Sequence, residues 1–134
     1  MIRWLLLFLT LGIGSAQAQG QCTVPAENPA TPVVSATAEG SHILKAAPGC
    51  LIATYITIGT TAGYLMIFNA TTAPADGAVA PTECIQVAAS TTNFLNWAPQ
   101  PPEWFNVGMV AVFSTTGCFI KTVSPIAFFH AIVQ

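Results

Sequence analysis

Short apolar runs alternate with turn residues along most of this chain. The runs are rich in β-branched and aromatic residues, and Pro, Gly, Asn and Asp fall between them at fairly regular intervals. That rhythm is typical of an antiparallel sandwich or barrel. We therefore predict an all-β fold: a single antiparallel β-sandwich, jelly-roll or Ig-like, with about eight strands over residues 33–134. The runs are residues 33–38, 42–47, 50–58, 64–70, 83–89, 94–97, 107–114, 118–123 and 126–133.

Glycines predict where the chain turns. Runs 50–58 and 64–70 flank a Gly-Thr-Thr-Ala-Gly loop, and runs 107–114 and 118–123 flank Thr-Thr-Gly. Glycine takes positive φ at little steric cost, so each pair is predicted to form a hairpin. In Pro74-Ala75-Asp76-Gly77, the proline presets φ, the aspartate bonds back to the backbone and the glycine supplies positive φ.

The first segment has the organisation of a secretory signal peptide. Arg3 supplies a positive start, residues 5–14 are an apolar run, and Ala16-Gln17-Ala18 is a small-x-small cleavage pattern. The apolar run is about half as long as a bilayer-spanning helix requires, which disfavours the alternative of a retained anchor. We predict a signal helix over residues 1–18 that is removed before Gln19, an extended arm over residues 19–32, and no membrane association afterwards. The expected location is secreted or periplasmic.

Four cysteines follow the signal segment. Their even number in an exported chain predicts two disulfides, and the sequence leaves all three pairings open. The alternative is a four-thiolate zinc site, which normally has close C-x-x-C pairs, whereas these gaps are 28, 34 and 34 residues. We therefore expect no metal and no cofactor. The cysteines are Cys22, Cys50, Cys84 and Cys118.

Charged residues make up only 6% of the chain, and the formal net charge is −2. Arg3, Lys45 and Lys121 are its only basic residues. Nucleic-acid binding requires basic side chains to neutralise phosphates, so nucleic acid is excluded as a partner. A surface with few charges repels other proteins weakly. We therefore expect self-association or a protein partner, with sheet edges as the contact.

Several motifs occur in an order known from one group of proteins. They are Ile43-Leu44-Lys45-Ala46-Ala47-Pro48-Gly49, Tyr64-Leu65-Met66-Ile67-Phe68-Asn69-Ala70-Thr71-Thr72-Ala73-Pro74, Pro81-Thr82, and Trp104-Phe105-Asn106-Val107-Gly108. From Ser41 onward, over about two-thirds of its length, the chain resembles small phage- and prophage-encoded β-sandwich proteins of the virion-structural type. The resemblance implies a non-enzymatic structural or assembly role, with a virion-associated location as an alternative to secretion. The signal segment and the cysteines depart from this pattern and indicate an exported, disulfide-stapled relative.

Few groups suit catalysis. His42 and His130 each share the parity of apolar neighbours, so buried histidines are favoured over a metal-binding pair. Asp76 and Glu83 bracket one loop and are the best candidates for two-carboxylate glycoside hydrolysis, but a turn role suffices for Asp76. No serine has a Gly-x-Ser-x-Gly setting. We expect no enzymatic activity.

The most distinctive surface candidate is the segment from Trp97 to Trp104. Pro99, Pro101 and Pro102 hold its backbone extended, which lowers the entropy lost on binding. The two indoles at its ends are suited to stack on a sugar ring or to fill a partner's pocket. The competing interpretation is that both indoles close the ends of the sandwich and only the prolines are exposed. A secreted or periplasmic glycan- or peptide-binding module is therefore the second function hypothesis.

Overall fold

The structure is a computed structural model that describes residue 22, residues 29–97 and residues 101–134. The predicted signal helix and most of the predicted arm lie outside these residues. The described part is all-β, as predicted, and none of its residues forms a helix able to cross a membrane. Its strands are β1 (Thr31–Val34), β2 (Ser41–Lys45), β3 (Gly49–Ile58), β4 (Gly63–Asn69), β5 (Gly77–Ala78), β6 (Glu83–Val87), β7 (Thr92–Asn96), β8 (Glu103–Phe105), β9 (Met109–Ser114), β10 (Ile120–Lys121) and β11 (Ala127–Val133).

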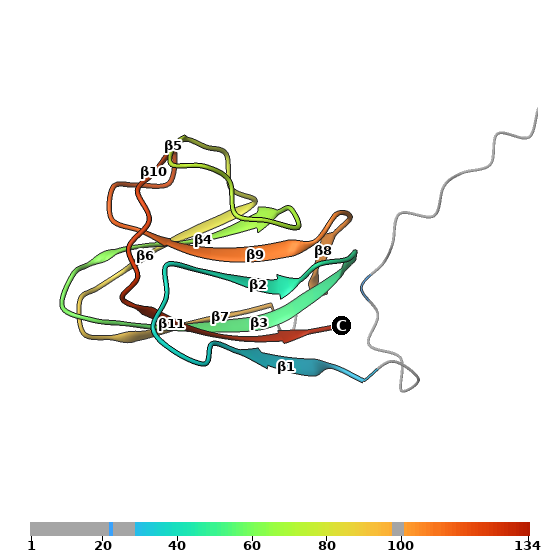
Figure 1. The fold of residues 1–134 in the computed structure, drawn as a ribbon. Coiled ribbons are helices and arrows are strands. Elements are labelled where there is room, and N and C mark those ends of the chain that lie inside the picture. The colour runs from blue at the N-terminus through green and yellow to red at the C-terminus, as the bar shows by residue number, and fades with distance from the viewer. Residues whose placement is uncertain (1–21, 23–28, 98–100) are drawn as a thin grey trace, which may run out of the picture.

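The strands form two facing sheets and one small ribbon (Figure 1). The first sheet has the order β1-β11-β3-β7, with β8 also paired to β3. The second sheet has the order β2-β9-β4-β6, and β5 pairs with β10 in the ribbon. All the pairings are antiparallel. Because most consecutive long strands lie in opposite sheets, the chain crosses the sandwich repeatedly.

The main core lies between the two sheets. Phe105, Phe113 and Phe129 are its largest fully buried side chains. Strand alternation places them there: along β11 the buried residues alternate with the more exposed Phe128 and His130. Burial of each phenylalanine side chain contributes about 1.5–3 kcal/mol relative to an exposed one.

A second, smaller core covers the outer face of the second sheet. Met66 and Phe68 of β4 and Val110 and Val112 of β9 are buried there. The segment between β4 and β6 contributes part of the cover, including Val79. Both faces of β4 and β9 are therefore buried, which explains why these strands are nearly continuous apolar runs.

The first predicted hairpin is wrong. β3 and β4 lie in different sheets, so the loop between them is an arch that crosses the sandwich. At Gly63 an added Cβ would lie 2.4 Å from the carbonyl oxygen of Ser114, so this glycine is needed for close approach to the end of β9. Period-two patterning is the same in a hairpin and in an arch, because both put one face of each strand in the core.

The second predicted hairpin forms only at its closed end. Ser114 makes an isolated antiparallel bridge with Val123, and Gly117 between them has the positive φ expected of it. β10 then pairs with β5 and not with β9. The predicted turn at residues 74–77 is also present, with Gly77 at a φ of 125°.

The strand count exceeds the expected number for a simple reason. The described residues form eleven strands, but β5, β8 and β10 have only two or three residues each. The other eight make up the two four-stranded sheet orders. β1 begins at Thr31, within the segment assigned to the arm.

Three of the family-like motifs meet at one end of the sandwich. Asn69 accepts a hydrogen bond from the backbone N of Val107 at 3.0 Å and donates one to Asn106 at 2.5 Å. An added Cβ at Gly108 would lie 2.9 Å from the carbonyl oxygens of both Lys45 and Ala70. These motif residues therefore have structural roles in this chain.

We predict that Phe129→Ala lowers the free energy of unfolding by about 3–5 kcal/mol, because it empties space in the main core. The matched control is Phe128→Ala, one residue away on the outer face, where the ring is 38% exposed. This control should change stability by less than about 1 kcal/mol. Chemical denaturation measures both, and equal losses would contradict the assignment of the two faces of β11.

Candidate functional site

All four cysteines form disulfides, as predicted, and the structure supplies the pairing. Cys22 bonds to Cys50 and Cys84 to Cys118, with Cα atoms 5.6 and 5.8 Å apart, within the usual range. The first bridge joins the predicted arm to β3, and the second joins β6 to the segment before β10. In the described part of the chain, no three His, Cys, Asp or Glu residues group so as to hold a metal.

The predicted Trp/Pro surface is divided between the core and the solvent. Trp97 is half-buried and packs against the main core, whereas Trp104 is 40% exposed. Pro101 is exposed and Pro102 is half-buried, while Pro99 lies outside the described residues. The two indoles therefore have different environments, and Trp104 is the one that presents a large surface to a ligand.

Trp104 is exposed because the residue that follows it in β8 is buried. Phe105, the next residue in β8, is fully buried, so Trp104 points to the opposite face of the strand. Directly across the strand pair lies Cys50, which is bonded to Cys22. Residues paired in this way have Cβ atoms about 4.5–5.5 Å apart. The indole thus lies beside the disulfide that holds the arm.

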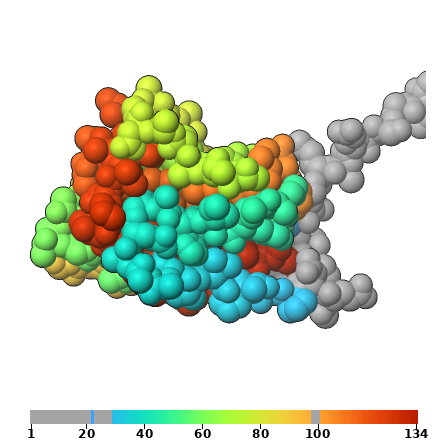
Figure 2. All heavy atoms as spheres, in the orientation of Figure 1, coloured from blue at the N-terminus to red at the C-terminus, as the bar shows by residue number. Residues whose placement is uncertain are grey.

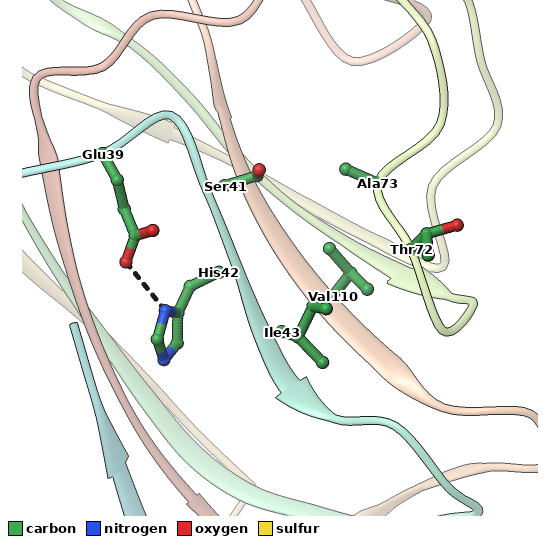
Figure 3. Close-up of a pocket in the computed structure, with 7 residues that line it drawn as sticks. All are labelled: Glu39, Ser41, His42, Ile43, Thr72, Ala73 and Val110. Carbon is green, nitrogen blue, oxygen red and sulfur yellow. Dashed lines mark ion pairs between the residues drawn. The ribbon is translucent and has the colours of Figure 1, made fainter.

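A groove of about 420 Å³ runs beside β2 (Figure 3). Figure 3 shows the Glu39 and His42 side chains on one side of β2 and Ile43 and Val110 on the other. The Nδ1 atom of His42 lies 2.7 Å from Oε1 of Glu39. Sequence analysis missed this partner, although it lies only three residues earlier. A carboxylate that orients an imidazole is a frequent arrangement around bases and metal ligands, but in the described part of the chain no third His, Cys, Asp or Glu joins this pair to hold a metal.

Both histidines were predicted to face the core, and only His42 does. His42 faces the core as its parity predicts: its ring stacks on Phe129 with centroids 6.5 Å apart, and the side chain remains 21% exposed. The expectation of a core-facing His130 is wrong. Phe129 and Ala131 occupy the core face of β11, so His130 lies half-buried on the outer face, 5.2 Å from the Tyr55 ring.

Asp76 and Lys121 form an ion pair that sequence analysis did not identify. The Lys121 side chain is only 4% exposed, and its Nζ donates to Asp76 Oδ1. Asp76 also accepts from the backbone N of Val123, at 3.3 Å. The hydrogen bond from Lys121 lowers the pKa of Asp76 below its ordinary value. Asp76 is therefore occupied in holding the β5–β10 ribbon.

Glu83, the other candidate carboxylate, has a different environment. It is half-buried on β6, and this burial raises its pKa, with a smaller contribution from the charge of Glu103. Asp76 is bound to a lysine, whereas Glu83 faces another carboxylate. The two carboxylates therefore interact with different charged groups.

The buried hydroxyl of Ser114 has a structural role as well. Ser114 Oγ accepts from the backbone N of Thr122 at 3.0 Å. It therefore ties the segment after β9 to the end of that strand. No His contact of Ser114 is present in the described part, so it does not form a nucleophile–base pair.

Comparisons with protein-family models, with curated proteins and with solved structures find no match to this chain. The resemblance to phage sandwich proteins therefore stays a prediction.

We predict that Asp76→Asn lowers the melting temperature at pH 7, because it leaves buried Lys121 without its counter-charge. The folded-state pKa of Asp76 is lowered, so the pair stabilises the fold above the ordinary aspartate pKa and loses this effect as pH falls through the lowered value. The difference from the native protein should therefore shrink below about pH 4.

Thermal unfolding followed by circular dichroism between pH 2 and pH 8 measures this difference. Glu103→Gln is the control, because it removes a carboxylate that faces Glu83 and has no buried cation as partner. A destabilisation by Asp76→Asn that is independent of pH would contradict the ion-pair explanation.

Proposed function

We propose that this chain is a non-enzymatic structural module with a jelly-roll fold, exported and disulfide-stapled, that assembles with copies of itself or with a protein partner. This is the role implied by the resemblance to phage virion-associated sandwich proteins. One observation carries the proposal: the outer face of the first sheet has no charged Asp, Glu, Lys or Arg and exposes a row of apolar side chains.

The strand orders support the jelly roll over the Ig-like alternative. Taking the eight longer strands in chain order, the sheets are β1-β11-β3-β7 and β2-β9-β4-β6. Among these strands, β4 and β6 are the one consecutive pair that is hydrogen-bonded. Ig-like sandwiches contain several such consecutive pairs within their sheets. Repeated crossing between two four-stranded sheets is the connectivity of a jelly roll.

The outer face of the first sheet combines an absence of charge with exposed apolar groups. None of the residues of β1, β3, β7 and β11 is Asp, Glu, Lys or Arg. One row crosses all four strands, with Val34, His130, Tyr55 and Phe94 directly opposite one another. Val34 is 46% exposed and Phe94 49% exposed. Interface cores are depleted of charge and enriched in aromatic residues in the same way.

The ring geometry favours a protein surface over a sugar on this face. Tyr55 and Phe94 stack with centroids 4.4 Å apart and an interplanar angle of 23°. Their facing sides are therefore occupied by each other. A pyranose needs an open ring face to stack on, whereas a flat protein surface packs well against ring edges and methyl groups.

The disulfides support the exported part of the proposal. Structural disulfides persist in secreted and periplasmic proteins and are rare where thiols are kept reduced. Both bridges tie peripheral segments to a sheet strand: the arm to β3, and the segment before β10 to β6. Such staples suit a module that must keep its surface shape outside the cell or in an envelope.

We predict that Phe94→Glu weakens self-association at least tenfold, because it places a charge at the β7 end of the row, on its most exposed side chain. Sedimentation velocity across a concentration series of the oxidised protein measures the association. Gln86→Glu is the matched control, since it adds the same charge at an exposed position of β6 in the other sheet. A native protein that stays monomeric and is absent from particles would overturn the assembly role.

Trp104 favours a second candidate function, a glycan-binding module. It is the exposed indole of the predicted binding segment, and a tryptophan face is suited to stack on a sugar ring. We predict for this candidate that Trp104→Ala abolishes retention on a polysaccharide matrix and leaves the melting temperature nearly unchanged. Trp97→Ala is the control that should lower stability, because Trp97 packs against the core. Equal retention of native and Trp104→Ala protein would exclude the glycan role of this indole.

A further inference from the structure

Two adjacent apolar residues next to the second disulfide are strongly exposed. Phe119 is 76% exposed and Ile120 is 58% exposed, the highest values among the large apolar side chains of the described residues. We name these two residues the apolar tip. Figure 2 shows the β5 and β10 region protruding from the body of the sandwich. Exposed apolar groups that gather at one place mark an interaction site more often than scattered ones do.

The apolar tip is held rigidly from both sides. Immediately before it, Cys118 is bonded to Cys84 of β6. Immediately after it, the buried side chain of Lys121 is paired with Asp76. A disulfide and a buried ion pair thus fix both ends of a two-residue segment whose own side chains face the solvent.

Hydrogen bonds fix the backbone of the tip as well. The carbonyl oxygen of Phe119 accepts from the backbone N of Val79 at 3.1 Å. The carbonyl oxygen of Ile120 accepts from the hydroxyl of Thr116 at 2.6 Å. Little backbone entropy therefore remains to be lost on binding, which is the property of a preorganised contact.

A pocket of about 280 Å³ lies beside the beginning of β1 and the ends of β2 and β11. We name it the end pocket. Its lining includes Val33, Leu44 and Val133, together with Lys45. An apolar cavity of about 150 Å³ holds a benzene ring, so the end pocket has room for a phenylalanine side chain.

The apolar tip and the end pocket lie at opposite ends of the molecule. The first residue of β9, Met109, pairs with Lys45 beside the pocket, and its last residue, Ser114, bridges to Val123 just after β10. Figure 1 shows the β5–β10 ribbon at one end of the sandwich and the C-terminus, beside the pocket, at the other. The tip of a molecule therefore reaches an end pocket only on another copy.

We propose that copies of this chain associate head to tail, with the apolar tip of one copy inserted into the end pocket of the next. This contact rests on the proposed assembly role and names the partner as a second copy of the chain. Because the two mating surfaces differ, each addition leaves one free tip and one free pocket, and the assembly grows into a ring or a filament.

The charges near the two surfaces are complementary. Asp76, 49% exposed, lies beside the tip through its contact with Lys121, and Lys45 lines the pocket. Lys121 neutralises part of the Asp76 charge, but half of the Asp76 side chain remains exposed. In the head-to-tail contact this exposed part of the carboxylate approaches the Lys45 side of the pocket of the next copy.

Two variants in the Phe94→Glu background test this contact without a contribution from the sheet face. Phe119→Asp removes the tip and keeps the pocket, whereas Thr31→Trp fills the pocket at an exposed lining residue and keeps the tip. Val107→Asp is the control, since it adds the same charge at a residue 47% exposed outside both surfaces. Sedimentation velocity should show each of the two variants alone as a monomer, with the control still assembling.

Mixing the two variants in equal amounts should restore one tip–pocket contact and give a one-to-one dimer that grows no further. Assembly of Phe119→Asp at native strength would overturn the head-to-tail contact. If Phe94→Glu weakens assembly and Phe119→Asp in the native background does not, the assembly role stands and only this inference fails. A native protein that remains monomeric overturns this inference, and one that is also absent from particles overturns the assembly role as well. Melting temperatures of all variants establish that each one is folded.

Discussion

Buried rings contributed by both sheets hold this sandwich together, and they also determine which side chains reach its surface. Phe105 and Phe129 come from the first sheet and Phe113 from the second, and all three are fully buried. A residue next to a core residue in a strand points to the opposite face of the sheet. Trp104 and His130 are therefore exposed or half-exposed because their neighbours are core residues. The surfaces proposed for binding are consequences of the core packing.

The second, smaller core imposes the other constraint. Val110 and Val112 of β9 need cover on the outer face of the second sheet, and the segment between β4 and β6 helps to provide it. This covering segment is held in place by the Asp76–Lys121 pair and by the pairing of β5 with β10. The same restraints fix the position of the apolar tip. The cover and the apolar tip are therefore restrained together, because β5 belongs to the cover and β10 contains a residue of the tip.

The apolar runs and turn residues predicted an all-β fold and the turn at Gly77, and the even number of cysteines predicted two disulfides. They could not distinguish the arch at Gly63 from a hairpin, since both require the same alternation of buried residues. They also placed His130 in the core, because both parities of β11 are apolar and only the packing of the opposite sheet selects one. Pairs such as Asp76 with Lys121 join residues far apart in the chain, so their contact depends on the whole topology.

Scarcity of charge explains why association is expected, but it does not by itself give a defined assembly. Two sheet edges of the described residues, β1 and β2, are poorly suited to open-ended strand addition. β1 has four residues and contains Pro32, and β2 has an irregular register between Ile43 and Lys45. Short, proline-containing and irregular edges are common protections against edge-to-edge pairing. The outer face of the first sheet, the apolar tip and the end pocket have none of these protections. The contacts proposed for these three surfaces would have a fixed geometry, and a fixed geometry distinguishes ordered assembly from aggregation.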